Sequence, residues 1–323
     1  MDRILNLLPG AVMMGCTYTL VAIGYCLFFG VLDVVVFCCG DIAMFGAFGI
    51  VGAYTVLYSA GLFGALPLPL FVLLLLLIAA ILCAALGLVS YYVSIKPFER
   101  SSTLMPLLST IALGTVIKEA LGLVFQPAIN GMAAAVTNPA VPDPKTVVGG
   151  RNPQAMPSLI AAGGSMVQRN ITIILIMVVI LAVLFLFLNK TKMGLSMQAI
   201  SQNKELAFMT GMDVKKIIVI TFVIGGLLLS VGGFVLGSYQ TIIRFDGGTL
   251  YGTKGFSAAV VGGLKSTWGA VIGGMLLGFV EVFAAGLIPG GTQWQNIIAF
   301  VVIIIFIVFK PEGIIGEKTI EKV

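Results

Sequence analysis

The sequence predicts an all-α membrane protein that crosses the bilayer about nine times. Of its residues, 59% are hydrophobic and only 10% are charged, whereas a soluble domain carries roughly a quarter charged residues. The mean hydropathy of +1.13 agrees with this deficit of charge. Forty glycines lie among many leucines, isoleucines and valines, and such small residues let membrane helices approach each other closely. These observations indicate a polytopic membrane protein.

Each predicted span is an apolar stretch of about 20 residues, the length that crosses roughly 30 Å of hydrocarbon. The stretches that meet this requirement are 9–30, 42–60, 67–93, 104–125, 171–189, 217–239, 268–288 and 294–309. The piece 253–263 is too short to cross alone, so we expect it to join the irregular stretch before it in one broken span. Residues 1–323 would then form a single transmembrane domain, with broken helices near 31–42 and 240–267.

Two long polar loops separate the spans, and the distribution of Lys and Arg assigns each to one side of the membrane. Short cytoplasmic loops carry an excess of both residue types, and lysines concentrate in the loop 190–216. The loop 126–168 lies on the opposite side and is rich in Pro, Gly and Asn. We therefore expect 190–216 to be cytoplasmic and 126–168 extracytoplasmic. Nine spans then put the N-terminus outside and the C-terminus inside.

The cytoplasmic loop contains a stretch with helical periodicity, residues 195–209. Its apolar residues near one face of that helix are Leu195, Ala199, Leu206 and Met209. Gly211 follows as a C-cap, and Asp213 precedes the next span as an N-cap. The polar face is not strongly basic, so we favour docking to a cytoplasmic partner over a helix that lies on the lipid surface.

Charged residues inside apolar spans are costly and therefore informative. Asp41 and Lys254 are expected to open short helices after breaks, where they either line a path for a polar solute or cap the helix. Glu281 lies inside the span 268–288, and we expect it to form hydrogen bonds between helices rather than to carry protons. The five cysteines fall in or beside apolar segments and are expected to be buried small residues. The chain has no His, and the sequence suggests neither a catalytic residue nor a metal site.

Several blocks of sequence resemble a known family, and they occur in that family's order. The blocks are 24–48, 95–114, 191–237, 252–286 and 297–318. They are similar to LivH-type permeases, the membrane subunits of ABC importers for branched-chain amino acids and related solutes. In the cytoplasmic loop, Glu205, Ala207 and Gly211 lie at the positions of the family's coupling motif. The resemblance implies that these residues couple the permease to ATPase subunits.

The first break departs from the family pattern. Residues 36–40 read Val-Phe-Cys-Cys-Gly, whereas the family has Asn-Phe-Ala-His-Gly there. This chain therefore lacks two polar groups at a place that the resemblance implies faces the transport path. Through the resemblance, the residues expected along the substrate path are Cys39, Asp41, Lys254, Phe256, Gly262 and Gly263.

The resemblance implies a permease subunit in the cytoplasmic membrane of a bacterium or archaeon. Its partners would be a second, LivM-like permease, two ABC ATPase subunits, an extracytoplasmic solute-binding protein and membrane lipid, with no nucleic acid. The chain itself has no phosphate-binding loop sequence, so ATP and Mg²⁺ would bind on the ATPase subunits and this chain would perform no covalent chemistry. Two alternatives remain. An ion-coupled secondary transporter would use Glu281 and Asp41, and a membrane scaffold or receptor would need no polar path.

Overall fold

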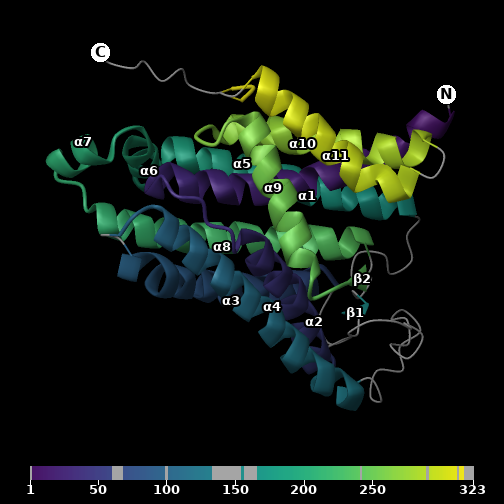
Figure 1. Cartoon of the computed structure of the whole chain (residues 1–323). Coiled ribbons are helices and arrows are strands. Elements are labelled where there is room, and N and C mark those ends of the chain that lie inside the picture. The colour runs from purple at the N-terminus through teal and green to yellow at the C-terminus, as the bar shows by residue number, and fades with distance from the viewer. Residues whose placement is uncertain are drawn as a thin grey trace. The chain divides into compact units, whose positions relative to one another are not determined.

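The structure is a computed structural model that describes residues 2–59, 68–98, 101–132, 154–155, 166–240, 242–288, 291–310 and 313–315. Its helices are α1 (Asp2–Leu32), α2 (Cys39–Ser59), α3 (Leu68–Ser90), α4 (Leu104–Met132), α5 (Met166–Lys190), α6 (Lys192–Gln202), α7 (Lys204–Met209), α8 (Val214–Gln240), α9 (Gly247–Gly262), α10 (Thr267–Leu287) and α11 (Gly291–Phe309) (Figure 1). A π-helical turn (Tyr91–Ile95) and a 3₁₀ turn (Lys96–Phe98) extend α3. The short strands β1 (Gln154–Ala155) and β2 (Ile242–Ile243) pair antiparallel.

The all-α, polytopic class predicted from the sequence is confirmed, since a helix lies at each predicted span. Within the described residues, five helical segments are long and apolar enough to cross a membrane on their own: Leu7–Leu32, Leu70–Phe98, Leu104–Leu123, Val214–Ser238 and Thr267–Leu287. A sixth is added if α5 and α6, which bend by 75° at their junction, form one broken span. The figure of nine crossings stays a prediction. Most of the predicted outer loop, 133–153 and 156–165, lies outside the described residues.

The second predicted break is shorter than expected. The sequence predicted an irregular stretch up to residue 252, but α9 begins at Gly247. Glycines disfavour a helix by about 1 kcal/mol each. Here close packing outweighs that cost, because a Cβ added at Gly248 would lie only 2.8 Å from the Cα of Asp41. In the described residues, the break before α9 is therefore confined to β2 and residues 244–246, whereas the first break, between α1 and α2, is at the predicted place.

The chain forms two compact units, each described by itself. Unit 1 comprises Met1–Val36, Asn170–Thr221 and Thr253–Val323. In this unit α1 packs along α10, and α10 packs against α11 (Figure 1). Glycines permit the close approach of α1 and α10, because a Cβ added at Gly274 would lie 2.5 Å from the backbone N of Thr19.

Unit 2 comprises Phe37–Arg169 and Phe222–Gly252. Here α2 packs against α3 and α4. The part of α8 in this unit crosses α2 closely, since a Cβ added at Gly46 would lie 2.8 Å from the Cα of Ser230. The thiol of Cys83 donates to the carbonyl oxygen of Ile42 at 3.5 Å, which joins α3 to α2.

Large apolar side chains are exposed along helices of both units. In α3 they include Leu73, Leu77 and Ile81; in α5, Leu175, Val179 and Val183; in α11, Ile297, Val301 and Ile304. An apolar surface of this extent is unfavourable in water. It is what a lipid environment requires, because lipid tails are as apolar as leucine.

Candidate functional site

The loop 190–216 folds into two helices rather than the single predicted helix over 195–209. Thr191 caps α6, and its hydroxyl oxygen accepts a hydrogen bond from Gly194 N at 3.0 Å. Asn203 then adopts an extended backbone, and its side-chain oxygen accepts from the backbone N–H groups of Glu205 and Leu206, both at 3.0 Å. The break occurs because Asn is a strong N-cap residue, which starts a new helix instead of continuing the old one.

The end of α7 agrees with the caps predicted from sequence. Gly211 has a φ of +81°, its N–H donates to Phe208 O at 3.0 Å, and the N–H of Met212 donates to Ala207 O at 3.3 Å. This pair of bonds around a left-handed residue is the Schellman motif. Asp213 then caps α8, since its carboxylate accepts from Lys216 N at 3.2 Å.

The apolar residues of α7 point away from the protein. Leu206, Phe208 and Met209 are 59%, 72% and 79% exposed. Ala207 is buried and anchors the helix, and Glu205 is exposed. The prediction of one continuous helix over 195–209 is wrong, because α6 ends at Gln202 and α7 begins at Lys204. Of the residues predicted to share its apolar face, Leu195, Leu206 and Met209 are exposed.

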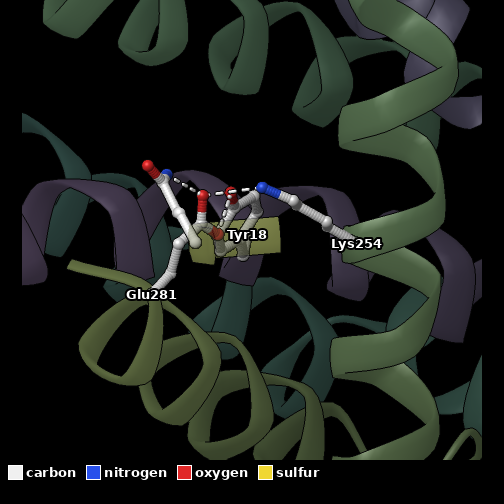
Figure 2. Close-up of polar contacts among 4 residues, drawn as sticks. Tyr18, Lys254 and Glu281 are labelled. Carbon is white, nitrogen blue, oxygen red and sulfur yellow. Dashed lines mark hydrogen bonds and ion pairs between the residues drawn. The ribbon is translucent and has the colours of Figure 1, made fainter. Parts of the chain in front are cut away.

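The most completely buried charges of unit 1 form one cluster around Glu281 (Figure 2). Lys254 is 1% exposed and Glu281 is 0% exposed, and the ammonium nitrogen lies 2.6 Å from Oε1 of the carboxylate. The hydroxyl of Tyr18 donates to Oε2 at 2.6 Å. The side-chain amide of Gln295 also donates to Oε1. Because these side chains come from α1, α9, α10 and α11, the cluster joins four helices.

The position of Lys254 differs from the sequence prediction in one respect. Since α9 begins at Gly247, Lys254 lies in the middle of the helix and does not open it. The prediction that Glu281 forms hydrogen bonds between helices is confirmed by its bonds to Tyr18 and Gln295. Phe256 follows Lys254 by two residues in α9 and contacts the ring of Tyr25, with 5.5 Å between ring centroids. A path-lining role for Lys254 and Phe256 stays a prediction.

Gly262 and Gly263 lie at the tight turn between α9 and α10. Gly263 has a φ of +113°, a conformation that favours glycine. A Cβ added at Gly262 would lie 2.8 Å from Ala270 N. The chain after α11 returns to this turn, where the N–H groups of Ile314 and Ile315 donate to the carbonyls of Val261 and Gly262 at 2.9 and 3.0 Å. The tail therefore satisfies carbonyl groups at the end of α9 that have no partner within the helix.

The remaining predicted path residues, Cys39 and Asp41, lie in the first turn of α2 in unit 2. Cys39 is fully buried and Asp41 is 7% exposed. All five cysteines are free and buried, as predicted. The structure thus places Cys39 and Asp41 together, and Lys254, Phe256, Gly262 and Gly263 together along α9 in unit 1.

Sequence reasoning missed Tyr18 and Gln295, although a signal for both was available. A buried Glu and Lys at membrane depth need hydrogen-bond partners, and Tyr and Gln are among the polar residues that apolar helices can supply. Which of the polar residues in the spans reach Glu281 depends on helix packing, which the sequence does not give.

Comparison with known proteins adds the family. Residues 7–307 match the model of the branched-chain amino acid transport system permease component. The chain is 31% identical to the high-affinity branched-chain amino acid transport system permease protein BraD of Pseudomonas aeruginosa, over 99% of this chain and 98% of the relative. It is 27% identical to the permease protein LivH of Escherichia coli, over 97% and 95% of the two chains.

An archaeal relative is also similar. The probable branched-chain amino acid transport permease protein LivH of Methanocaldococcus jannaschii is 27% identical over 84% of this chain and 81% of the relative. No solved structure matches the chain. The family match covers most of the sequence, and the apolar helices agree with it. The chain therefore belongs to the family of permease components of branched-chain amino acid transport systems.

Proposed function

We propose that this chain is the permease subunit of an ATP-driven ABC importer, and that its solute is a branched-chain or related amino acid. It works with a second, LivM-like permease, two ATPase subunits that bind ATP and Mg²⁺, and an extracytoplasmic solute-binding protein. The N-terminus lies outside and the C-terminus inside, and the chain performs no covalent chemistry. Family membership and the names of the relatives support this proposal.

The observation that carries the proposal is the exposed apolar surface of α7, formed by Leu206, Phe208 and Met209. These side chains stand on a short helix whose two ends are fixed, by Asn203 at one end and by the Gly211 turn at the other. A fixed helix that presents large apolar side chains on a polar loop is suited to binding another protein. The predicted coupling residues Glu205, Ala207 and Gly211 lie on or next to this helix.

The connections of α7 to α1 and α8 explain how a movement of the ATPase subunits against α7 would be transmitted to the breaks after these two helices. At its N-terminal end α7 follows α6, which packs against α1. The approach is close, since a Cβ added at Gly30 of α1 would lie 3.2 Å from the Cβ of Ser201 of α6. On the other side α7 leads through Asp213 into α8. Since α1 ends at Leu32 and α8 at Gln240, each before a break, closure of the ATPase subunits would move the helices that lead into both breaks.

The test compares the surface of α7 with a matched exposed residue elsewhere. We expect the Phe208→Ser and Met209→Ser variants to insert normally but to retain less ATPase subunit on co-purification, because the change removes apolar contact area without touching a buried group. Phe309→Ser is the control, since Phe309 is also a strongly exposed Phe and lies at the end of α11. Equal retention of the ATPase by the α7 variants and by Phe309→Ser would count against the proposal.

A further inference from the structure

The first break is held to two helices of unit 2 through side-chain hydroxyl groups. The backbone N–H of Phe37 donates to Oγ1 of Thr110 on α4 at 3.3 Å. The thiol of Cys38 donates to Oγ of Ser90, the last residue of α3, at 3.8 Å. Cys38, Ser90 and Thr110 are each fully buried. Two consecutive residues of the break are therefore fixed by polar contacts, one to each helix.

Each of the two hydroxyl groups is used twice, once within its own helix and once toward the break. Ser90 Oγ donates to Leu86 O at 2.9 Å, and Thr110 Oγ1 donates to Leu107 O at 2.8 Å. A hydroxyl group has one donor hydrogen and two acceptor lone pairs, so its oxygen can still accept a hydrogen bond from the break. An apolar residue at either position would take this acceptor away, and a buried donor that loses its acceptor is costly.

The end of α3 is itself joined to α4 beside these contacts. The π-helical turn Tyr91–Ile95 follows Ser90 directly, and π-helical turns are rare and frequent at functional sites. Ser94 in this turn is fully buried, and its hydroxyl donates to the carbonyl oxygen of Ser109 at 3.4 Å. Ser109 immediately precedes Thr110. The break, α3 and α4 are thus joined pairwise, through the three hydroxyl groups of Ser90, Ser94 and Thr110, which we call the hydroxyl clamp.

The clamp lies where α2 begins. The carbonyl oxygen of Cys38 accepts a hydrogen bond from the backbone N of Ile42, in the first turn of α2, at 2.9 Å. The position of Cys38 therefore sets the position of that turn. The same turn carries Cys39 and Asp41, two of the residues expected along the substrate path, so a shift of the break would move both.

We infer that Ser90 and Thr110 are positioning residues of the transport path, which hold the first break in place and thereby orient the first turn of α2. The inference rests on the proposed function, since it names residues that position the path of that solute. Neither hydroxyl group has to touch the solute in this role, because both act through Phe37 and Cys38.

The experiment measures opening of the break in the assembled permease–ATPase complex in nanodiscs. The reagent is N-ethylmaleimide, a small thiol reagent that enters membranes, and mass spectrometry gives the alkylation rate of each native cysteine. All five cysteines are free and buried, so alkylation requires local opening. Thr110→Val keeps the shape of the side chain but removes the hydroxyl. We expect it to raise the alkylation rates of Cys38 and Cys39 by about tenfold, with Cys83 of the same unit unchanged.

Two further variants separate the hydroxyl contact from other effects of a substitution. Thr110→Ser keeps the hydroxyl and should give wild-type alkylation rates. Thr115→Val is the matched control, since Thr115 is an exposed residue of the same helix whose hydroxyl donates to Ile111 O, and it should also leave the rates unchanged. Unchanged rates at Cys38 and Cys39 in Thr110→Val, or an equal rise at Cys83, would overturn the inference.

Leucine uptake by the complete system, measured per assembled complex, tests whether the position of the break matters for transport. We expect Thr110→Val to lose most of the uptake, and Thr110→Ser and Thr115→Val to keep it. Wild-type uptake by a Thr110→Val complex whose break has opened contradicts the positioning role. A wild-type complex that imports no leucine contradicts the proposed function instead, and the alkylation rates, which do not depend on the solute, still decide whether the clamp holds the break.

Discussion

Removal of the Glu281 carboxylate should destabilise the protein far more than removal of an exposed charge. In Glu281→Leu, the ammonium group of Lys254, which is 1% exposed, loses the anion 2.6 Å away. Breaking a buried ion pair by removing one partner costs about 3–5 kcal/mol, because the other charge is left uncompensated. Lys254→Met should cost less, about 1–3 kcal/mol, since Glu281 keeps its hydrogen bonds from Tyr18 and Gln295.

The double variant Lys254→Met/Glu281→Leu tests whether the loss of stability in Glu281→Leu comes from the uncompensated charge of Lys254. It removes both charges together, and replacing a buried pair by apolar residues of similar volume is often close to neutral. We therefore expect the double variant to be more stable than Glu281→Leu alone, by about 2 kcal/mol or more. The coupling free energy between the two positions is then large, as it is for groups in direct contact.

The assay is denaturant unfolding of the purified chain in detergent micelles, with the midpoint and slope compared among the variants. Lys265→Met provides the control, because Lys265 forms a 2.9 Å ion pair with Asp33 that is about half exposed. Exposed pairs of this kind contribute about 0–1 kcal/mol. If the free-energy losses of the two single variants simply add in the double variant, the Lys254–Glu281 contact does not hold unit 1 together and the reasoning is refuted.

Four further outcomes are expected. Gly211→Val should cost about 1 kcal/mol of local stability and weaken ATPase co-purification, whereas Gly211→Asn should be tolerated, because only the β-branched residue resists the observed φ of +81°; equal behaviour of the two would contradict this. Gly262→Leu should abolish assembly or transport, since the added side chain meets Ala270 at the turn, and a wild-type uptake rate would refute it. Deleting residues 130–157 should abolish uptake while ATPase subunits still co-purify, if that loop docks the solute-binding protein; normal uptake would exclude this role. Ser196→Cys should react with a membrane-impermeant maleimide from the cytoplasmic side only, against a low background because the native cysteines are buried, and labelling from outside would reverse the assigned orientation.

Local sequence signals predicted much of the fold. Helix positions follow from apolar stretches, because a bilayer admits few other ways to satisfy the backbone. The end at Gly211 and the start at Asp213 follow from the chemistry of single residues, and the structure has both caps. The first break, after Leu32, was also visible in the sequence. These features depend on a few neighbouring residues, so no knowledge of packing is needed to predict them.

The features that the sequence did not reveal depend on contacts between distant segments. Glu281 binds Tyr18, 263 positions away in the chain, and nothing local to either residue indicates the other. The helical start at Gly247 goes against glycine's low helix propensity, and the close approach of Asp41 to Gly248 depends on a segment about 200 positions away that no local signal indicates. The break at Asn203 is different, because Asn is a strong N-cap residue and is therefore a local signal for a new helix. The apolar periodicity over 195–209 predicted one continuous helix instead.

The most direct measurement of the proposed transport mechanism is uptake of labelled leucine into proteoliposomes. The vesicles contain this chain with its second permease and ATPase subunits, and receive the solute-binding protein on the outer side. We predict uptake that requires ATP inside the vesicles, requires the binding protein, and does not change when proton and sodium gradients are abolished. Uptake by this chain alone, driven by a proton or sodium gradient without ATP, would contradict the proposal and establish an ion-coupled transporter instead.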